Sequence, residues 1–165
     1  MSKIKKLELT KEQVNFLKVA GIGLGSYLIY KAFKKVGKSF KDVFGNYSDE
    51  KELLENINSE QKELKKKGMT LSYSLYTYKS DSEVLLNAMG RLGTDEDSIY
   101  RVFSKMNNDL DVSELFKQFG THLYAISPIN FQYLDLNGWI SEELDNKEIA
   151  KLNQILANNN ITYRF

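Results

Sequence analysis

The feature that most constrains the fold of this chain is a series of apolar stripes at helical spacing in residues 81–165. Apolar residues recur there every three or four positions, as on the buried face of an amphipathic helix. Most stripes are bounded by a capping residue or a glycine. The spacing predicts a small all-α bundle whose inner face includes Phe116, Phe119, Trp139 and Leu144. The first two expected helices are Ser82–Arg91 and Asp95–Met106, the second with Thr94 as its N-cap. The third begins with the capping box Asp111 and Glu114 and ends at Gly120, and the fourth is Trp139–Leu144. The fifth begins with the capping box Asp145 and Glu148.

The loop between the first two expected helices has a distinctive sequence, Ala88–Asp97. A helix that ends in Met89 runs into a glycine-containing loop, and Thr94 then begins a helix with three acids in its first turn. Carbonyl oxygens are unpaired at a helix C-terminus, and acids stabilise the positive end of the next helix. This loop and the order of the helices over about residues 82–157 resemble a single annexin repeat.

In annexins such a loop holds calcium between the protein and phospholipid phosphate. The resemblance implies carbonyl ligands from Met89, Arg91 and Gly93, and a carboxylate ligand from Glu143. Arg91 stands where the annexin loop has a glycine, and an apolar segment, Thr121–Tyr133, is added to the ordinary repeat. Calcium takes about six to eight oxygens, so this set predicts weak binding. The alternative is that no cofactor binds and the three acids only stabilise a helix start.

The N-terminal residues predict a long helical arm, residues 1–45. Thr10 and Gln13 form a capping box for a helix over Lys11–Phe44. From Gln13 to Tyr30 only Lys18 is charged, and this segment would be roughly 27 Å long, close to the thickness of a bilayer's hydrocarbon. The expected membrane or assembly contacts are Phe16, Leu17, Ile22, Leu24, Leu28 and Ile29. The expected basic face is Lys31, Lys34, Lys35, Lys38 and Lys41.

Three interpretations of this arm remain open. It inserts into a membrane and lies along its anionic surface, it packs in an oligomeric assembly with its basic face toward nucleic acid or a lumen, or it docks on its own chain.

The charges are strongly divided along the chain: residues 1–41 have ten Lys and two Glu, hence +8, whereas residues 81–165 have seven bases and thirteen acids, hence −6. A basic arm on an acidic domain implies different partners for the two ends.

The connector, residues 46–80, predicts a charged and mostly solvated helix over Asp49–Lys67, capped by Ser48, and then an extended strap, Met69–Lys79. The apolar segment Thr121–Tyr133 is expected either to enter the core or to form a contact surface. The tail Ile161–Phe165 is expected to be extended, with its aromatic side chains packed on the bundle.

Catalytic chemistry has little support in this sequence. His122 is the only histidine and there are no cysteines, so neither a two-histidine metal site nor a thiolate site is available. The glycines of Gly21–Gly25 lie in a predicted helix and not after a strand, which disfavours a phosphate-binding loop. We therefore expect no enzyme activity and no small-molecule substrate.

A single annexin-like repeat with a basic arm resembles small virion-associated proteins of tailed bacteriophages. The resemblance implies a structural or assembly protein located in the virion. Its expected partners are other virion proteins or copies of itself, with non-specific nucleic-acid contact by the basic arm. One alternative is calcium-dependent binding to anionic phospholipid, and another is a membrane-associated protein tethered by Gln13–Tyr30.

Overall fold

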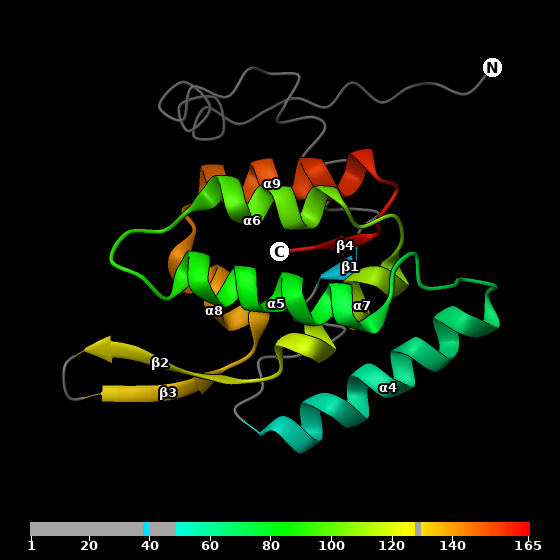
Figure 1. The fold of residues 1–165 in the computed structure, drawn as a ribbon, viewed down its shortest axis with the longest axis horizontal. Coiled ribbons are helices and arrows are strands. Elements are labelled where there is room, and N and C mark those ends of the chain that lie inside the picture. Colours follow the sequence, from blue (N-terminus) through cyan, green and yellow to red (C-terminus); the bar gives the residue numbers. More distant parts are fainter. Residues whose placement is uncertain (1–37, 40–48, 128–129) are drawn as a thin grey trace, which may run out of the picture.

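The computed structural model describes residues 38–39, 49–127 and 130–165, most of which are helical (Figure 1). This confirms a mostly α-helical protein. The helices are α4 (Glu50–Lys66), α5 (Leu75–Met89), α6 (Glu96–Ser104), α7 (Asp109–Phe119), α8 (Leu136–Glu143) and α9 (Asn146–Asn158). The strands are β1 (Lys38–Ser39), β2 (His122–Ser127), β3 (Asn130–Leu134) and β4 (Tyr163–Arg164).

The apolar stripes of the second half form one core, as predicted. Helix α5 packs against α6 and α7, and α6 packs against α9. Leu85 of α5, Phe103 of α6 and Phe116 of α7 are completely buried. Trp139 of α8 is 6 % exposed and joins the same core. Burial of these side chains stabilises the fold by about 1.5–3 kcal/mol each.

Helix α4 packs on this body through a thin stripe and is exposed along most of the rest of its length, which confirms the prediction of a mostly solvated helix. Its stripe of Leu53, Ile57 and Leu64 is buried, and the helix packs against α7. Asp49, and not Ser48, is its N-cap, accepting hydrogen bonds from the backbone of the first turn.

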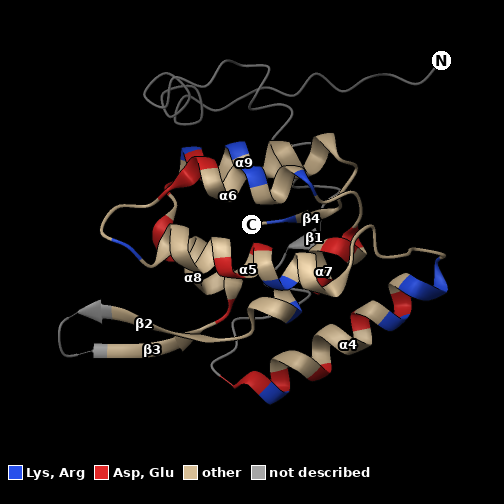
Figure 2. Ribbon diagram, in the orientation of Figure 1, with Lys and Arg blue, Asp and Glu red and all other residues tan. Residues whose placement is uncertain are grey.

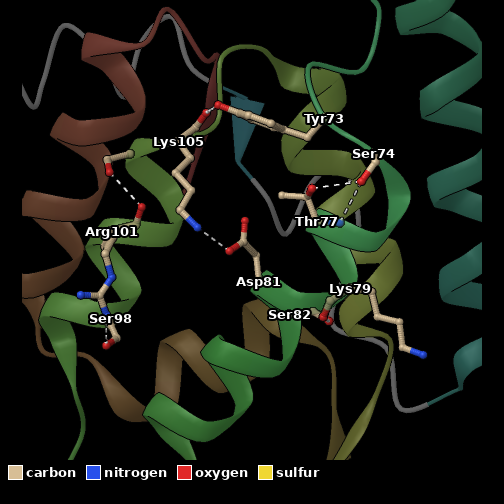
Figure 3. Close-up of polar contacts among 10 residues, drawn as sticks. Tyr73, Ser74, Thr77, Lys79, Asp81, Ser82, Ser98, Arg101 and Lys105 are labelled. Atoms are coloured by element: carbon tan, nitrogen blue, oxygen red, sulfur yellow. Dashed lines mark hydrogen bonds and ion pairs between the residues drawn. The ribbon is translucent and has the colours of Figure 1, made fainter.

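The predicted strap, Met69–Lys79, is helical in its second half, because Ser74 caps α5 well before Ser82. The Tyr78 ring points into the core, and its hydroxyl donates to Asp111 at 2.5 Å. Three residues further along α5, Asp81 accepts a hydrogen bond at 2.6 Å from Lys105, at the end of α6 (Figure 3). These contacts hold the first turns of α5 against α6 and α7.

Besides the starts of α4 and α5, three further predicted helix starts are wrong by a few residues, and one is confirmed. Helix α6 is capped by Asp95 rather than Thr94, and α8 begins at Leu136 behind Asp135 rather than at Trp139. Helix α7 is capped by Asn108, so the predicted capping box of Asp111 and Glu114 is absent and Asp111 is buried instead. The capping box of Asp145 and Glu148 at α9 is confirmed.

The apolar segment Thr121–Tyr133 contains an antiparallel hairpin, β2–β3, and not an irregular loop. His122 pairs with Leu134, Leu123 with Tyr133, Tyr124 with Gln132 and Ala125 with Phe131. Figure 1 shows the hairpin extending from the helical body next to α8. Among the described strands it is a two-stranded sheet, in which each strand has one edge without a partner strand.

The tail packs on the bundle as predicted. Tyr163 is fully buried, and Phe165 contacts the rings of Phe103 and Phe116. Strand β4 pairs in parallel with β1, so Lys38 and Ser39 are in a strand where the long arm helix was predicted. The remainder of that arm helix lies outside the described residues.

Candidate interaction site at the hairpin end

The loop between α5 and α6 lies next to the end of α8. Gly93 has a positive φ of 83°, which lets the chain turn toward α6 at no steric cost. Thr94 donates from its hydroxyl to Glu143 Oε2 at 2.6 Å. The structure thus brings Glu143, from the end of α8, to the loop that follows Met89 and contains Arg91 and Gly93.

Both oxygens of Glu143 accept hydrogen bonds in this structure. Oε1 takes the hydroxyl of Tyr124, on β2, at 2.9 Å, and Oε2 takes that of Thr94. Burial, together with this bond to Glu143, raises the pKa of Tyr124 to about 12, so its hydroxyl keeps its proton at neutral pH. A calcium ion at this loop would have to replace at least one hydroxyl as the partner of Glu143.

The other two backbone groups proposed as calcium ligands come from different surroundings. Met89 ends α5 with its side chain buried in the core, whereas Arg91 is exposed in the loop. Across residues 49–127 and 130–165, no group of three or more His, Asp or Glu side chains is arranged to hold a metal ion. A site here would therefore depend on Glu143 and backbone carbonyls.

One face of the hairpin packs on the helical body. The Tyr124 ring meets Trp139 edge-on at a centroid distance of 4.9 Å, and His122 meets Phe119 in the same way at 4.9 Å. The indole nitrogen of Trp139 donates to the His122 carbonyl at 3.4 Å. Gly138 gives α8 a close approach to β3, because a Cβ there would lie 2.9 Å from the Leu134 Cβ.

The opposite face of the hairpin is apolar and exposed. Successive side chains of a strand point to opposite faces, and directly paired residues share a face. Two such pairs, Leu123 with Tyr133 and Ala125 with Phe131, form what we call the outer face. Leu123, Phe131 and Tyr133 are 53 %, 53 % and 54 % exposed.

The hairpin also has no charged side chains. Residues 118–134 contain no Lys, Arg, Asp or Glu, although such residues make up 27 % of the chain. In Figure 2 the two strands are neutral, whereas every helix around them carries charge. Exposed strand edges are commonly protected from pairing by charged side chains. A neutral, apolar hairpin with open edges is suited to contact another molecule.

A surface hollow lies at the base of the hairpin, next to the C-terminal end of α5. The hollow has a volume of about 330 Å³ and lies between the end of α5 and the start of β2. Leu123 belongs to both the hollow and the outer face. The hollow is lined by Leu86, Asn87, Gly90, Arg91, His122, Leu123 and Trp139.

Sequence reasoning found part of this surface. It marked Thr121–Tyr133 as core or contact surface, and the hairpin divides these roles between its two faces. It did not join His122, Arg91 and Trp139, which lie far apart in the sequence. The predicted arm contacts (Phe16, Leu17, Ile22, Leu24, Leu28, Ile29) and the basic-face residues Lys31, Lys34, Lys35 and Lys41 lie outside the described residues; of Lys38, only its place in β1 is described.

Comparison with known proteins gives no match to this chain, whether with protein-family models, with curated proteins or with solved structures. Within the part of the chain that the structure describes, no helix combines the length and hydropathy needed to cross a bilayer.

Proposed function

We propose that this chain is a non-enzymatic structural or assembly protein of a bacteriophage virion, which contacts other virion proteins through the outer face of its hairpin. The exposed outer face is the observation that carries the proposal. Full burial of an aromatic or aliphatic side chain is worth about 1.5–3 kcal/mol. Leu123, Phe131 and Tyr133 are about half exposed, so covering all three would contribute about 2–4 kcal/mol to association.

The division of charge supports two contacts in an assembly. The acidic helical domain presents the hairpin, whereas residues 1–41 carry ten Lys and a long apolar segment. In the proposed particle this arm is the anchor, either among other subunits and nucleic acid or in a host membrane during genome delivery. The sequence resemblance of residues 82–157 to a single annexin repeat, of the kind seen in small virion-associated proteins, also supports the proposal.

The test is the protein's incorporation into particles of the phage that encodes it. Mass spectrometry of purified particles should find the chain in a fixed ratio to the major capsid protein. The double substitution Phe131→Ser and Tyr133→Ser should lower that ratio several-fold, because it removes most of the outer face. Leu92→Ser is the matched control, since Leu92 is fully exposed in the α5–α6 loop and away from the hairpin. A chain present in the lysate but absent from particles would contradict the proposal.

A second candidate is calcium-dependent binding to anionic phospholipid, which the position of Glu143 beside the α5–α6 loop favours. Calorimetry with calcium in the presence of phosphatidylserine vesicles should then show saturable binding. Glu143→Gln should abolish it, and Glu142→Gln should not, because Glu142 is exposed on the same helix. Equal binding by the wild type and Glu143→Gln excludes this candidate.

A further inference from the structure

The hollow at the base of the hairpin has the dimensions of a socket for one side chain. Its volume of about 330 Å³ is at the lower end of the range of about 300–1,000 Å³ found for small-molecule sites. It is open to solvent beside the exposed side chain of Leu123. A single large apolar side chain therefore fits.

The lining of this hollow combines apolar walls with one cationic side chain, Arg91. Leu86, Leu123 and Trp139 supply the walls. Arg91 and His122 supply a guanidinium and an imidazole, and no carboxylate lines the hollow. This is an exception in residues 81–165, whose net charge is −6 from seven bases and thirteen acids.

The charge of Arg91 is available to a ligand. Among the described residues the ion pairs join Lys66 to Glu63 and Lys105 to Asp81, and Arg91 takes part in neither. Arg91 is one of the charges that act on the carboxyl group of Asp95. The pKa of Asp95 is lowered mainly by hydrogen bonds from Ser98, and the charge of Arg91 is the smallest of the causes. An exposed guanidinium beside an apolar hollow is suited to bind a carboxylate through paired hydrogen bonds.

We propose that the hollow and the outer face together form one docking site for an extended segment of a partner protein. The segment places an apolar side chain in the hollow and a neighbouring carboxylate on Arg91, and its next apolar residues cover Leu123 and Tyr133. This inference rests on the proposed assembly function and names the chemistry of the partner. Leu123 makes the site continuous, because it belongs to both parts.

The dimensions of the site favour a segment over a second copy of the domain or a bilayer. A stable protein interface buries about 800 Å² on each partner, and three half-exposed side chains with one small hollow provide much less. Insertion into a bilayer would leave the open edges of β2 and β3 without hydrogen-bond partners, which is costly in hydrocarbon. A bound segment fills the hollow and supplies backbone groups to a strand edge.

Trp139 makes the site directly measurable, because it is the only tryptophan and it lines the hollow. The probes are N-acetyl-L-phenylalanine, which carries a carboxylate, and N-acetyl-L-phenylalaninamide, which does not. Titrated into the full chain, the acid should change Trp139 fluorescence saturably, with a Kd of about 1 mM, as expected for about 4 kcal/mol from one anchor. The amide should bind about tenfold more weakly.

Two variants assign the effect to named groups. Arg91→Gln should remove the preference for the acid over the amide. Lys147→Gln, which removes one exposed charge elsewhere, should keep it. Equal affinity for acid and amide, a preference that survives Arg91→Gln, or no saturable change at all would overturn the proposal. A change in Trp139 fluorescence with phosphatidylcholine vesicles and not with the acid would also overturn it, in favour of a lipid surface.

The particle assay separates this inference from the proposed function. One outcome is that incorporation depends on Phe131 and Tyr133 while N-acetyl-L-phenylalanine does not bind. In that case the assembly function stands, and the proposed binding of an apolar side chain and a carboxylate at the hollow is wrong. If the acid binds as described but the chain is absent from particles, the site stands and its partner lies outside the virion.

Discussion

Replacing Asp111 by Asn is expected to lower the free energy of unfolding by about 2–4 kcal/mol. Asp111 is fully buried, and its two oxygens accept three hydrogen bonds. Oδ1 accepts from the Tyr78 hydroxyl at 2.5 Å and from the Ser72 backbone at 2.9 Å. Oδ2 accepts from the Asn107 backbone at 2.9 Å. One carboxylate therefore joins α5, the segment before it and the turn before α7.

The magnitude follows from the number of acceptors. Asparagine has one acceptor oxygen, and its NH₂ group must face a donor. If the oxygen keeps the bonds from Tyr78 and Ser72, the NH₂ group at the buried position faces the Asn107 N–H donor with no acceptor between them, at a cost of about 1–3 kcal/mol. The two bonds that remain also lose their charge, which weakens them by about 1 kcal/mol together.

The assay is urea unfolding monitored by circular dichroism. The slope m of the unfolding free energy against urea concentration should be the same for the variant and the wild type. Glu55→Gln is the matched control, because it removes the same charge from an exposed position in α4. A double-mutant cycle with Tyr78→Phe should give a coupling of about 1 kcal/mol or more, since the two side chains are in contact. An Asp111→Asn variant within about 0.5 kcal/mol of Glu55→Gln would refute this account of the network.

Three further predictions concern individual elements. Asp145→Ala should lower the unfolding free energy by about 1 kcal/mol and Asp145→Asn by much less, because asparagine is an equally good N-cap; equal losses in urea unfolding would argue against the capping role. Gly138→Ala should cost about 1–3 kcal/mol, because its Cβ would meet Leu134 Cβ at 2.9 Å and Cδ2 at 3.0 Å; a calorimetric melt like that of the wild type would contradict the close packing of α8 on β3. Burial raises the pKa of both Tyr100 and Tyr124 to about 12, with help from nearby carboxylates, whereas the unfolded value is about 10. The folded state therefore holds these protons more tightly, so the contribution of these two tyrosines to stability should be constant below about pH 10 and fall between about pH 10 and 12; Tyr100→Phe with Tyr124→Phe should reduce that fall in denaturant titrations at fixed pH.

The parts of the fold that depend on local pattern were predictable from the sequence. The stripe of Ile99, Val102 and Phe103 repeats at helical spacing, and burial on one face is the only way to remove it from water. The capping box of Asp145 and Glu148 needs only residues close in sequence, and the structure contains it. Such features depend on geometry within one or two helical turns.

The incorrect predictions arose where distant residues decide the structure. Asp111 and Glu114 have the spacing of a capping box, but Asn108 caps α7. The Asp111 carboxylate instead accepts hydrogen bonds from Tyr78 and Ser72. The Tyr-rich sequence before Ser82 suggested an extended strap, whereas burial of Tyr78 against α7 favours a helix. The hairpin was missed because Ser127-Pro128-Ile129-Asn130 lacks the Asn-Gly or Asp-Gly signal of a tight turn.

The pairing of β1 with β4 determines how the domain bears mechanical load. A pull on the chain before Lys38 acts first on β4, which is hydrogen-bonded beside it. The load then passes through the Tyr163 hydroxyl to Glu60 of α4, and through Phe165 to Asn153 of α9 and the rings on α6 and α7. Tension on the basic arm is therefore distributed over four helices (α4, α6, α7 and α9). A single helix does not bear the whole force.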